Sequence, residues 1–164
     1  MTPAPPRVVL DTVVFVQALI SGRGPSAGCI DRLRTGQFVL LLSDAIRAEL
    51  QHVPLRPELS RRYSHITAER VNAFVAEIAS LAVEIAHPPN VFALPRDPKD
   101  EPFIDLAVAG DADFIVTWNE RHLTYLMKQD TPEGRDFVSR YPKIGIVTPP
   151  QLLRLLDAPQ ARSE

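Results

Sequence analysis

The sequence predicts an α/β domain in which helices flank a central parallel sheet of about five strands. Short apolar runs rich in Val, Ile and Leu, typical of strands buried on both faces, alternate with segments of helical periodicity. Strands that alternate with helices form parallel sheets with right-handed crossovers. We therefore expect one three-layer domain over residues 7–156, a disordered N-terminal tail at 1–6 and a C-terminal tail at 157–164.

The first elements follow from an apolar run and the turn signals after it. A strand is expected over 7–10 and a helix over 12–20, because turn-forming Gly and Pro residues gather only at 21–25. Ser26 is the expected N-cap of a second helix, which ends near Gly36.

The next elements repeat the order of strand and helix. The continuous apolar run 38–42 predicts a buried strand, and Ser43 or Asp44 is expected to cap a helix that nearby prolines break. The basic stretch 55–66 is expected to be irregular.

Residue 67 opens the longest helix that the sequence predicts. Thr67 caps an amphipathic segment that runs to about Leu81, and a short strand is expected over 83–85. Four prolines then keep residues 86–98 extended.

The last elements place a helix over 100–109, a strand over 114–117 and a final strand over 144–147. Residues 127–142 are expected to form a charged loop or a ragged helix. Pro149 opens a final helix, because proline is accepted in a first helical turn.

Composition limits the classes of function. The 164 residues carry 18 basic and 20 acidic side chains, a net charge of −2, so no global positive field gathers nucleic acid. Cys29 is the only cysteine, which excludes an internal disulfide and argues against a cysteine-based zinc site. We expect a cytoplasmic protein without a membrane partner, because neither a signal peptide nor an apolar membrane span is recognisable.

Four oxygen-bearing side chains stand at comparable boundaries between elements: Asp11, Glu49, Asp100 and Asn119. Each has a simpler interpretation: a helix cap, a solvated ion pair, charge at a helix N-terminus and a turn former, respectively. Together they are hard oxygen ligands at the edge where open α/β sheets place their chemistry. The set indicates a Mg²⁺ or Mn²⁺ site suited to phosphodiester hydrolysis.

Four blocks of sequence resemble the PIN-domain family, in the subgroup of toxins from toxin–antitoxin pairs. The blocks are VVLDT at 8–12, LSDAIRAEL at 42–50, DPKDEPFIDLA at 97–107 and GDADFIVTWN at 110–119. The resemblance runs from about residue 7 to 156 and implies a metal-dependent ribonuclease with a parallel sheet flanked by helices. It also implies a homodimer and an antitoxin peptide as partners.

Carried over by motif, the family's metal-binding acids fall on Asp11, Glu49 and Asp100, and Asn119 stands where a fourth acid is usual. Asp97 is also usual in this subgroup and is expected to support the metal-binding acids without contacting the ion itself. In the mechanism that this implies, Asp11 and Asp100 hold the ion, Glu49 binds it or orients the attacking water, and Asn119 completes the set.

Substrate contacts are expected from two groups of residues. Thr12 and Thr117 are candidates for hydrogen bonds to a phosphate or for support of the site. A local basic patch that binds RNA is expected from four arginines in the second quarter of the chain, with a solvated surface as the alternative. These arginines are Arg47, Arg56, Arg61 and Arg62.

Two departures from the family pattern support a second hypothesis. Val13 replaces an Asn that commonly supports the first acid, and Asn119 removes a negative charge, which lowers metal affinity. The alternative is a catalytically weak or inactive PIN-like protein that binds RNA or protein, with helix 67–81 as its interface. A phosphatase with Asp11 as nucleophile is a third reading, but Val13 stands where such chemistry needs another acid.

Overall fold

The computed structural model describes residues 3–158, which form a five-stranded sheet in the order β3-β2-β1-β4-β5. All four strand pairs are parallel, as predicted. The strands are β1 (Arg7–Leu10), β2 (Val39–Leu42), β3 (Val83–Glu84), β4 (Phe114–Val116) and β5 (Gly145–Val147).

Eight α-helices connect these strands within the described residues. They are α1 (Thr12–Ile20), α2 (Pro25–Arg34), α3 (Asp44–His52), α4 (Pro57–Ser60), α5 (Ala68–Leu81), α6 (Glu101–Ala109), α7 (Pro132–Arg140) and α8 (Pro149–Asp157). Three short 3₁₀ turns complete the chain: η1 (Val53–Leu55), η2 (Pro98–Asp100) and η3 (Thr124–Lys128).

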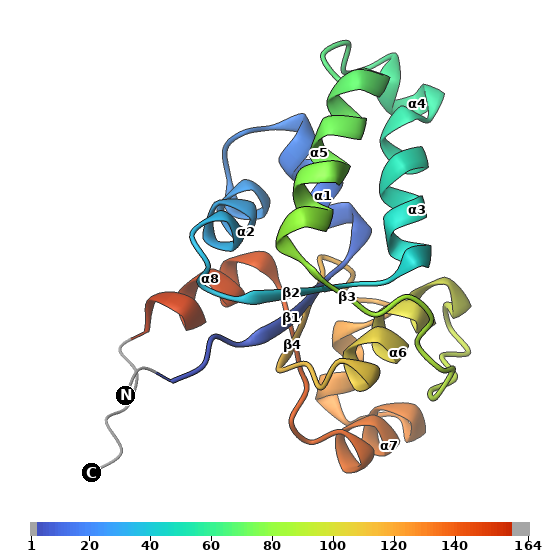
Figure 1. The fold of residues 1–164 in the computed structure, drawn as a ribbon. Helices are drawn as coiled ribbons and strands as arrows, with labels where there is room; N and C mark the ends of the chain where they lie inside the picture. Colours follow the sequence, from blue (N-terminus) through green and yellow to red (C-terminus); the bar gives the residue numbers. More distant parts are fainter. Residues whose placement is uncertain (1–2, 159–164) are drawn as a thin grey trace.

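The direction of the crossovers assigns the helices to two layers. From β1 the chain moves through β2 to the edge strand β3, and then it crosses back to β4 and β5 on the other side of β1. Right-handed crossovers in opposite directions must use opposite faces of the sheet. Figure 1 shows this arrangement, with α1, α2, α3 and α5 on one side of the sheet and α6 and α7 on the other. The reversal occurs between β1 and β4, so a crevice is expected beyond their carboxyl ends.

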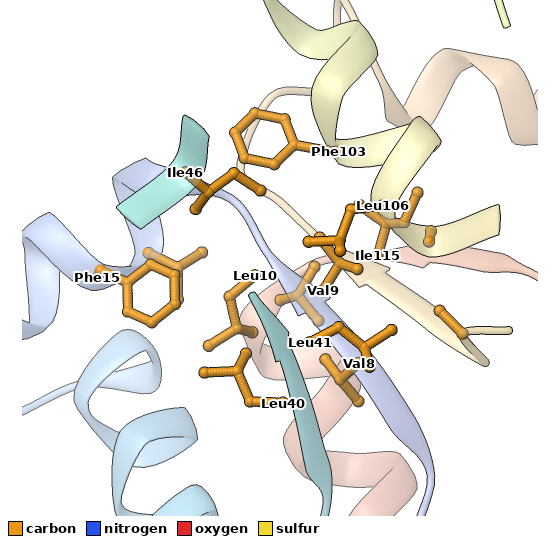
Figure 2. Packing of buried hydrophobic residues seen from close by; sticks show 14 of the residues in the cluster. Val8, Val9, Leu10, Phe15, Leu40, Leu41, Ile46, Phe103, Leu106 and Ile115 are labelled. Carbon is orange, nitrogen blue, oxygen red and sulfur yellow. The ribbon is translucent and has the colours of Figure 1, made fainter. Parts of the chain in front are cut away.

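The core lies against both faces of the two central strands. Val8, Val9 and Leu10 of β1 and Leu40 and Leu41 of β2 are at most 1% exposed. Figure 2 shows Phe15 of α1 on one side of these strands, and Phe103 and Leu106 of α6 on the other. Burial on both faces explains why the strands read as continuous apolar runs rather than as alternating patterns.

One sequence prediction about local structure is wrong, and another is only partly right. Ser26 does not cap α2: Gly24 is the N-cap with φ 94°, a conformation that favours glycine. Ser26 is buried instead, where its hydroxyl donates to Gln17 and accepts from the Trp118 indole. Residues 127–142, expected to form a charged loop or a ragged helix, contain the regular helix α7, whose N-cap Thr131 accepts from the Gly134 amide.

The basic stretch 55–66, expected to be irregular, contains the single helical turn α4. Of the predicted tails, residues 1–2 and 159–164 lie outside the described residues. Asp157, at the start of the predicted C-terminal tail, ends α8 and forms an ion pair with Arg32.

A proline-rich segment, residues 86–97, runs alongside α6. Two acids of α6 hold it through its backbone: Glu101 Oε1 accepts from Leu94 N at 2.8 Å, and Asp105 Oδ1 accepts from Val91 N at 2.9 Å. These bonds satisfy amides that have no sheet partner in an extended segment. They also explain why Asp105 is buried one turn inside a helix.

Helix α5 uses its apolar face for the core. Val71, Val75 and Ile78 are at most 2% exposed, so this face is not free to serve as the protein interface suggested by the second hypothesis. In the described part of the chain no single helix is long and apolar enough to cross a membrane, and α1 with α2 reach that length only as a pair bent by 98°.

Candidate active site

Asp11 lies at the carboxyl end of β1, beside the end of β4. Its backbone amide donates to Val116 O, which continues the pairing of the two strands by one residue. One carboxylate oxygen caps α1 by accepting from Val13 N, and the other accepts from Thr117 Oγ1 at 2.7 Å. Both side chains are buried, so the orientation of Asp11 is fixed by its own helix and by the neighbouring strand.

Glu49 reaches the same edge from α3. Its Oε2 accepts from Thr12 Oγ1 at 2.6 Å, although the residue as a whole is exposed. Ser43 positions the helix, because its hydroxyl accepts from Ile46 N at the first turn. Thr12 thereby joins the start of α1 to the middle of α3.

Asp100 enters from the start of α6 and is also buried. Its Oδ2 accepts from Asn119 Nδ2 at 3.0 Å. The orientation of the Asn119 amide follows from a second bond, because its Oδ1 accepts from the His122 backbone amide. The amide oxygen of Asn119 is therefore engaged in the turn after β4, and its nitrogen faces Asp100.

The three predicted ligand acids thus share one pattern. Each carboxylate accepts a hydrogen bond from a different side chain that the sequence had also singled out: Thr117 for Asp11, Thr12 for Glu49 and Asn119 for Asp100. In this structure Thr12 and Thr117 hold carboxylates rather than pointing to open solvent. This arrangement restricts the orientation of the oxygens before any substrate binds.

The electrostatics of the site favour a cation. Burial raises the pKa of Asp100 to about 6, and the charges of Asp11, Asp97 and Glu49 act in the same direction. Burial also raises the pKa of Asp11, with Glu49 adding to the effect, although the bonds from Thr117 and Val13 oppose it. Buried carboxylates that repel one another gain most from a divalent ion or a proton.

Oxygen donors are the ligands that Mg²⁺ and Mn²⁺ prefer, so the donor chemistry fits such an ion. Within residues 3–158, however, no three acid, histidine or cysteine side chains lie close enough to form a ready ligand set. Mg²⁺ commonly uses only one or two carboxylates and keeps several waters or substrate oxygens. The pair Asp11 and Asp100 meets that requirement.

Asp97 and His122 form the outer border of the site. Asp97 Oδ1 caps the 3₁₀ turn η2 by accepting from Lys99 N. Its other oxygen, Oδ2, lies 3.4 Å from His122 Nδ1, in an orientation that makes no hydrogen bond. The charge of His122 acts to lower the pKa of Asp100. No sequence pattern distinguishes His122 from a surface histidine, because its position beside Asp97 depends on the turn after β4.

The arginines predicted to bind RNA do not form one free patch. Arg47 pairs with Glu84 at 2.8 Å, and Arg62 stacks over the Tyr63 ring at 5.4 Å. Arg56 and Arg61 are exposed on either side of α4, which Figure 1 shows beyond the end of α3 and away from the sheet.

Comparison with known proteins agrees with this architecture. Residues 7–121 match the family model described as PIN domain. The chain is also 27% identical over 146 residues to the uncharacterized protein MJ1680 of Methanocaldococcus jannaschii, covering 84% of this chain and 92% of that protein. The chain belongs to the PIN domain family, whose members are typically nucleases that use divalent metal ions.

Proposed function

We propose that this protein is a Mg²⁺- or Mn²⁺-dependent endoribonuclease that hydrolyses phosphodiester bonds of single-stranded RNA. The observation that carries the proposal is the pair of buried carboxylates, Asp11 at the carboxyl end of β1 and Asp100, which accepts from Asn119 just after β4. Burial of two acids without a basic partner is unfavourable for folding alone, and a bound cation would offset that cost.

Asp11, Asp100 and Glu49 would hold the metal, which when bound supplies an activated water and stabilises the charge of the leaving oxygen. The chain's own groups orient these acids. Thr117 fixes Asp11, and Asn119 fixes Asp100 from the adjacent strand end. The Thr12 hydroxyl restrains Glu49, the most exposed of the three acids, so that its second oxygen is available to the metal or to the attacking water.

The biological role that we propose is the toxin of a toxin–antitoxin pair, acting as a homodimer and inhibited by an antitoxin peptide. This part of the proposal depends on the resemblance of the four sequence blocks. Induced expression of the wild-type chain should arrest growth of a bacterial host, whereas Asp100→Asn should not. Equal growth with both chains would contradict the toxin role but not the nuclease activity.

The activity itself is tested with a labelled, unstructured RNA incubated with Mg²⁺, Mn²⁺ or EDTA. Cleavage should require the metal and should disappear in Asp100→Asn, which removes the charge and keeps the shape of the side chain. Glu69→Gln is a matched control, because Glu69 is an exposed acid on α5.

Two outcomes decide between the candidate functions. Metal-dependent cleavage by wild type and by Glu69→Gln, but not by Asp100→Asn, would establish the nuclease. Folded wild-type protein that cleaves no RNA with either metal would favour the binding role suggested by Val13 and Asn119.

A further inference from the structure

A cleft of about 750 Å³ opens beside the candidate active site. It is lined by the segment after β4 and by the end of the proline-rich segment, and its cationic members are Arg96, Arg121 and Lys128. His122 belongs both to this cleft and to the border of the site, where it lies 3.4 Å from Asp97. The cleft therefore begins next to the carboxylates and leads away from them.

Arg96 is held in place before any ligand binds. Its guanidinium carbon lies 4.2 Å from the centre of the Tyr125 ring, and its Nε lies 3.8 Å from Glu133 Oε1. The Tyr125 hydroxyl donates to the same Glu133 oxygen at 3.1 Å. Stacking and pairing through Nε leave the two terminal nitrogens of the guanidinium for a ligand, and a preorganised planar fork suits phosphate oxygens.

Arg121 and Lys128, the other two cations of the cleft, are free to bind a ligand. Both are exposed, and neither forms an ion pair with any residue in the described range 3–158. Arg47, by contrast, is paired with Glu84. The cleft beside the site thus contains two exposed cations that no acid of the described residues pairs with, whereas Arg47 on α3 is already engaged.

We propose that this cleft binds the phosphate backbone of the single-stranded RNA on one side of the cleaved bond. The inference rests on the proposed nuclease function, and it identifies the surface along which the RNA strand leaves the active site. Arg96 binds a phosphate next to the scissile one. Arg121 and Lys128 contact phosphates of the RNA backbone farther from the cleaved bond. Local cations are needed because the chain as a whole carries a net charge of −2.

Two acids in the same cleft make the direction of the effect on RNA affinity testable. Glu120 and Asp130 line the cleft beside the cations, and both are exposed. If phosphates bind here, removal of a cation must weaken RNA binding and removal of Asp130 must strengthen it. A merely structural role for these side chains does not predict opposite signs.

The test measures the affinity of a fluorescent oligouridine for the full chain by anisotropy, with Ca²⁺ in place of Mg²⁺ to slow cleavage. Arg121→Gln/Lys128→Gln should bind about tenfold more weakly, and the slope of log affinity against log salt should fall by about 0.7 per lost phosphate contact. Asp130→Asn should bind several-fold more tightly. Arg70→Gln, which changes an exposed arginine on α5, is the matched control and should bind like wild type.

Arg96→Lys tests the preorganised fork separately, because it keeps the charge but cannot bind a phosphate with two parallel bonds. Thermal unfolding shows whether this variant stays folded without its stacking on Tyr125. Arg121 and Lys128 make no such contacts, so their variants decide the proposal even if Arg96→Lys unfolds.

Unchanged RNA affinity in Arg121→Gln/Lys128→Gln, or weaker binding by Asp130→Asn, would overturn the cleft assignment. Displacement of the RNA by oligoglutamate at equal charge would also overturn it, since the cleft would then be a general anion site. Failure of the nuclease function is distinguishable, because it is read from cleavage with Mg²⁺ or Mn²⁺ and not from binding.

Discussion

The acids of the 97–105 block divide into two pairs that differ in what they contact. Asp97 and Asp100 face the turn after β4, where neither forms an ion pair with a lysine or an arginine in the described chain. Glu101 and Asp105 face the proline-rich segment, where each accepts a backbone N–H. The first pair concentrates negative charge at the candidate site. The second pair supplies hydrogen-bond acceptors to backbone amides that have no other partner among the described residues. The turn η2 and the first turns of α6 therefore place electrostatically unfavourable site acids directly beside acids that stabilise the neighbouring segment.

The largest expected effect separates the two pairs by activity. Asp100→Asn should lower the rate of RNA cleavage by about a hundredfold or more, because it weakens the stabilisation of transition-state charge. Asp105→Asn, which keeps an acceptor for Val91 N, should cleave at close to the wild-type rate. Single-turnover rates at saturating Mn²⁺ measure both. Similar losses in the two variants would show that the pairs are not distinct.

The next effect concerns pH. The pKa of Asp100 is about 6 in the folded chain and 3.8 in the reference state, so the folded chain binds this proton more tightly. Ionisation of Asp100 therefore lowers the free energy of unfolding above pH 6, and this effect disappears as the pH falls below about 4. The free energy of unfolding of metal-free Asp100→Asn should exceed that of wild type by on the order of 2–3 kcal/mol at pH 7. The difference should vanish near pH 4.

Urea unfolding of both chains at several pH values checks this prediction. Because Asp11 and Asp100 interact, the observed midpoint belongs to the pair rather than to one residue. Added Mg²⁺ at pH 7 should reverse the order of stability, since it stabilises wild type more than the variant. If metal-free Asp100→Asn were less stable than wild type at pH 7, the claim that ionised Asp100 destabilises the metal-free fold would be contradicted.

A somewhat smaller effect is expected at the second pair. Asp105→Ala leaves the Val91 amide without an acceptor and should lower the free energy of unfolding by about 1–3 kcal/mol. Asp105→Asn retains an acceptor oxygen, so it should lower the free energy of unfolding by less than Asp105→Ala does. It is therefore the control. Denaturant unfolding measures the difference. Equal stability of Asp105→Ala and wild type would mean that this anchor contributes nothing.

The smallest effect should come from restoring the acid that is usual in the family. Asn119→Asp removes the donor to Asp100 and adds a charge beside it, which raises the pKa of Asp100 further. The metal-free chain should lose roughly 1 kcal/mol of stability, while its affinity for Mn²⁺ should rise several-fold. Calorimetric titration with Mn²⁺ checks the affinity, and weaker binding would show that the Asn119 bond matters more than the added charge.

The sheet and most helix boundaries could be predicted because they depend on local patterns. The apolar runs of β1 and β2 and the N-caps Ser43 and Thr67 carry their signals within a few residues. Helix α7, predicted only as one of two alternatives, also had a local signal, Thr131 followed by proline, which the charged surroundings obscured. The glycine cap of α2 was missed because Ser26 is the better cap by composition, yet its hydroxyl is used by Gln17.

The contacts within the site could be predicted only in part. The positions of the motifs indicated which acids lie at the edge of the sheet. They did not indicate which side chain donates a hydrogen bond to each acid. Asn119 was expected to complete the metal's ligands, whereas its amide oxygen accepts from His122 and its nitrogen donates to Asp100. The cleft was missed for the same reason, since Arg96 and Arg121 are far apart in sequence and meet only through the turn after β4.

The backbone anchoring of the proline-rich segment limits how this stretch can change over evolution. Four prolines stand at 88, 89, 95 and 98, yet the two positions that donate to α6 are Val91 and Leu94. Proline has no N–H to give, so it is the one residue that either donor position must exclude on chemical grounds. We expect homologous chains to gain and lose prolines freely around these two positions but not at them, provided that the acids of α6 are kept.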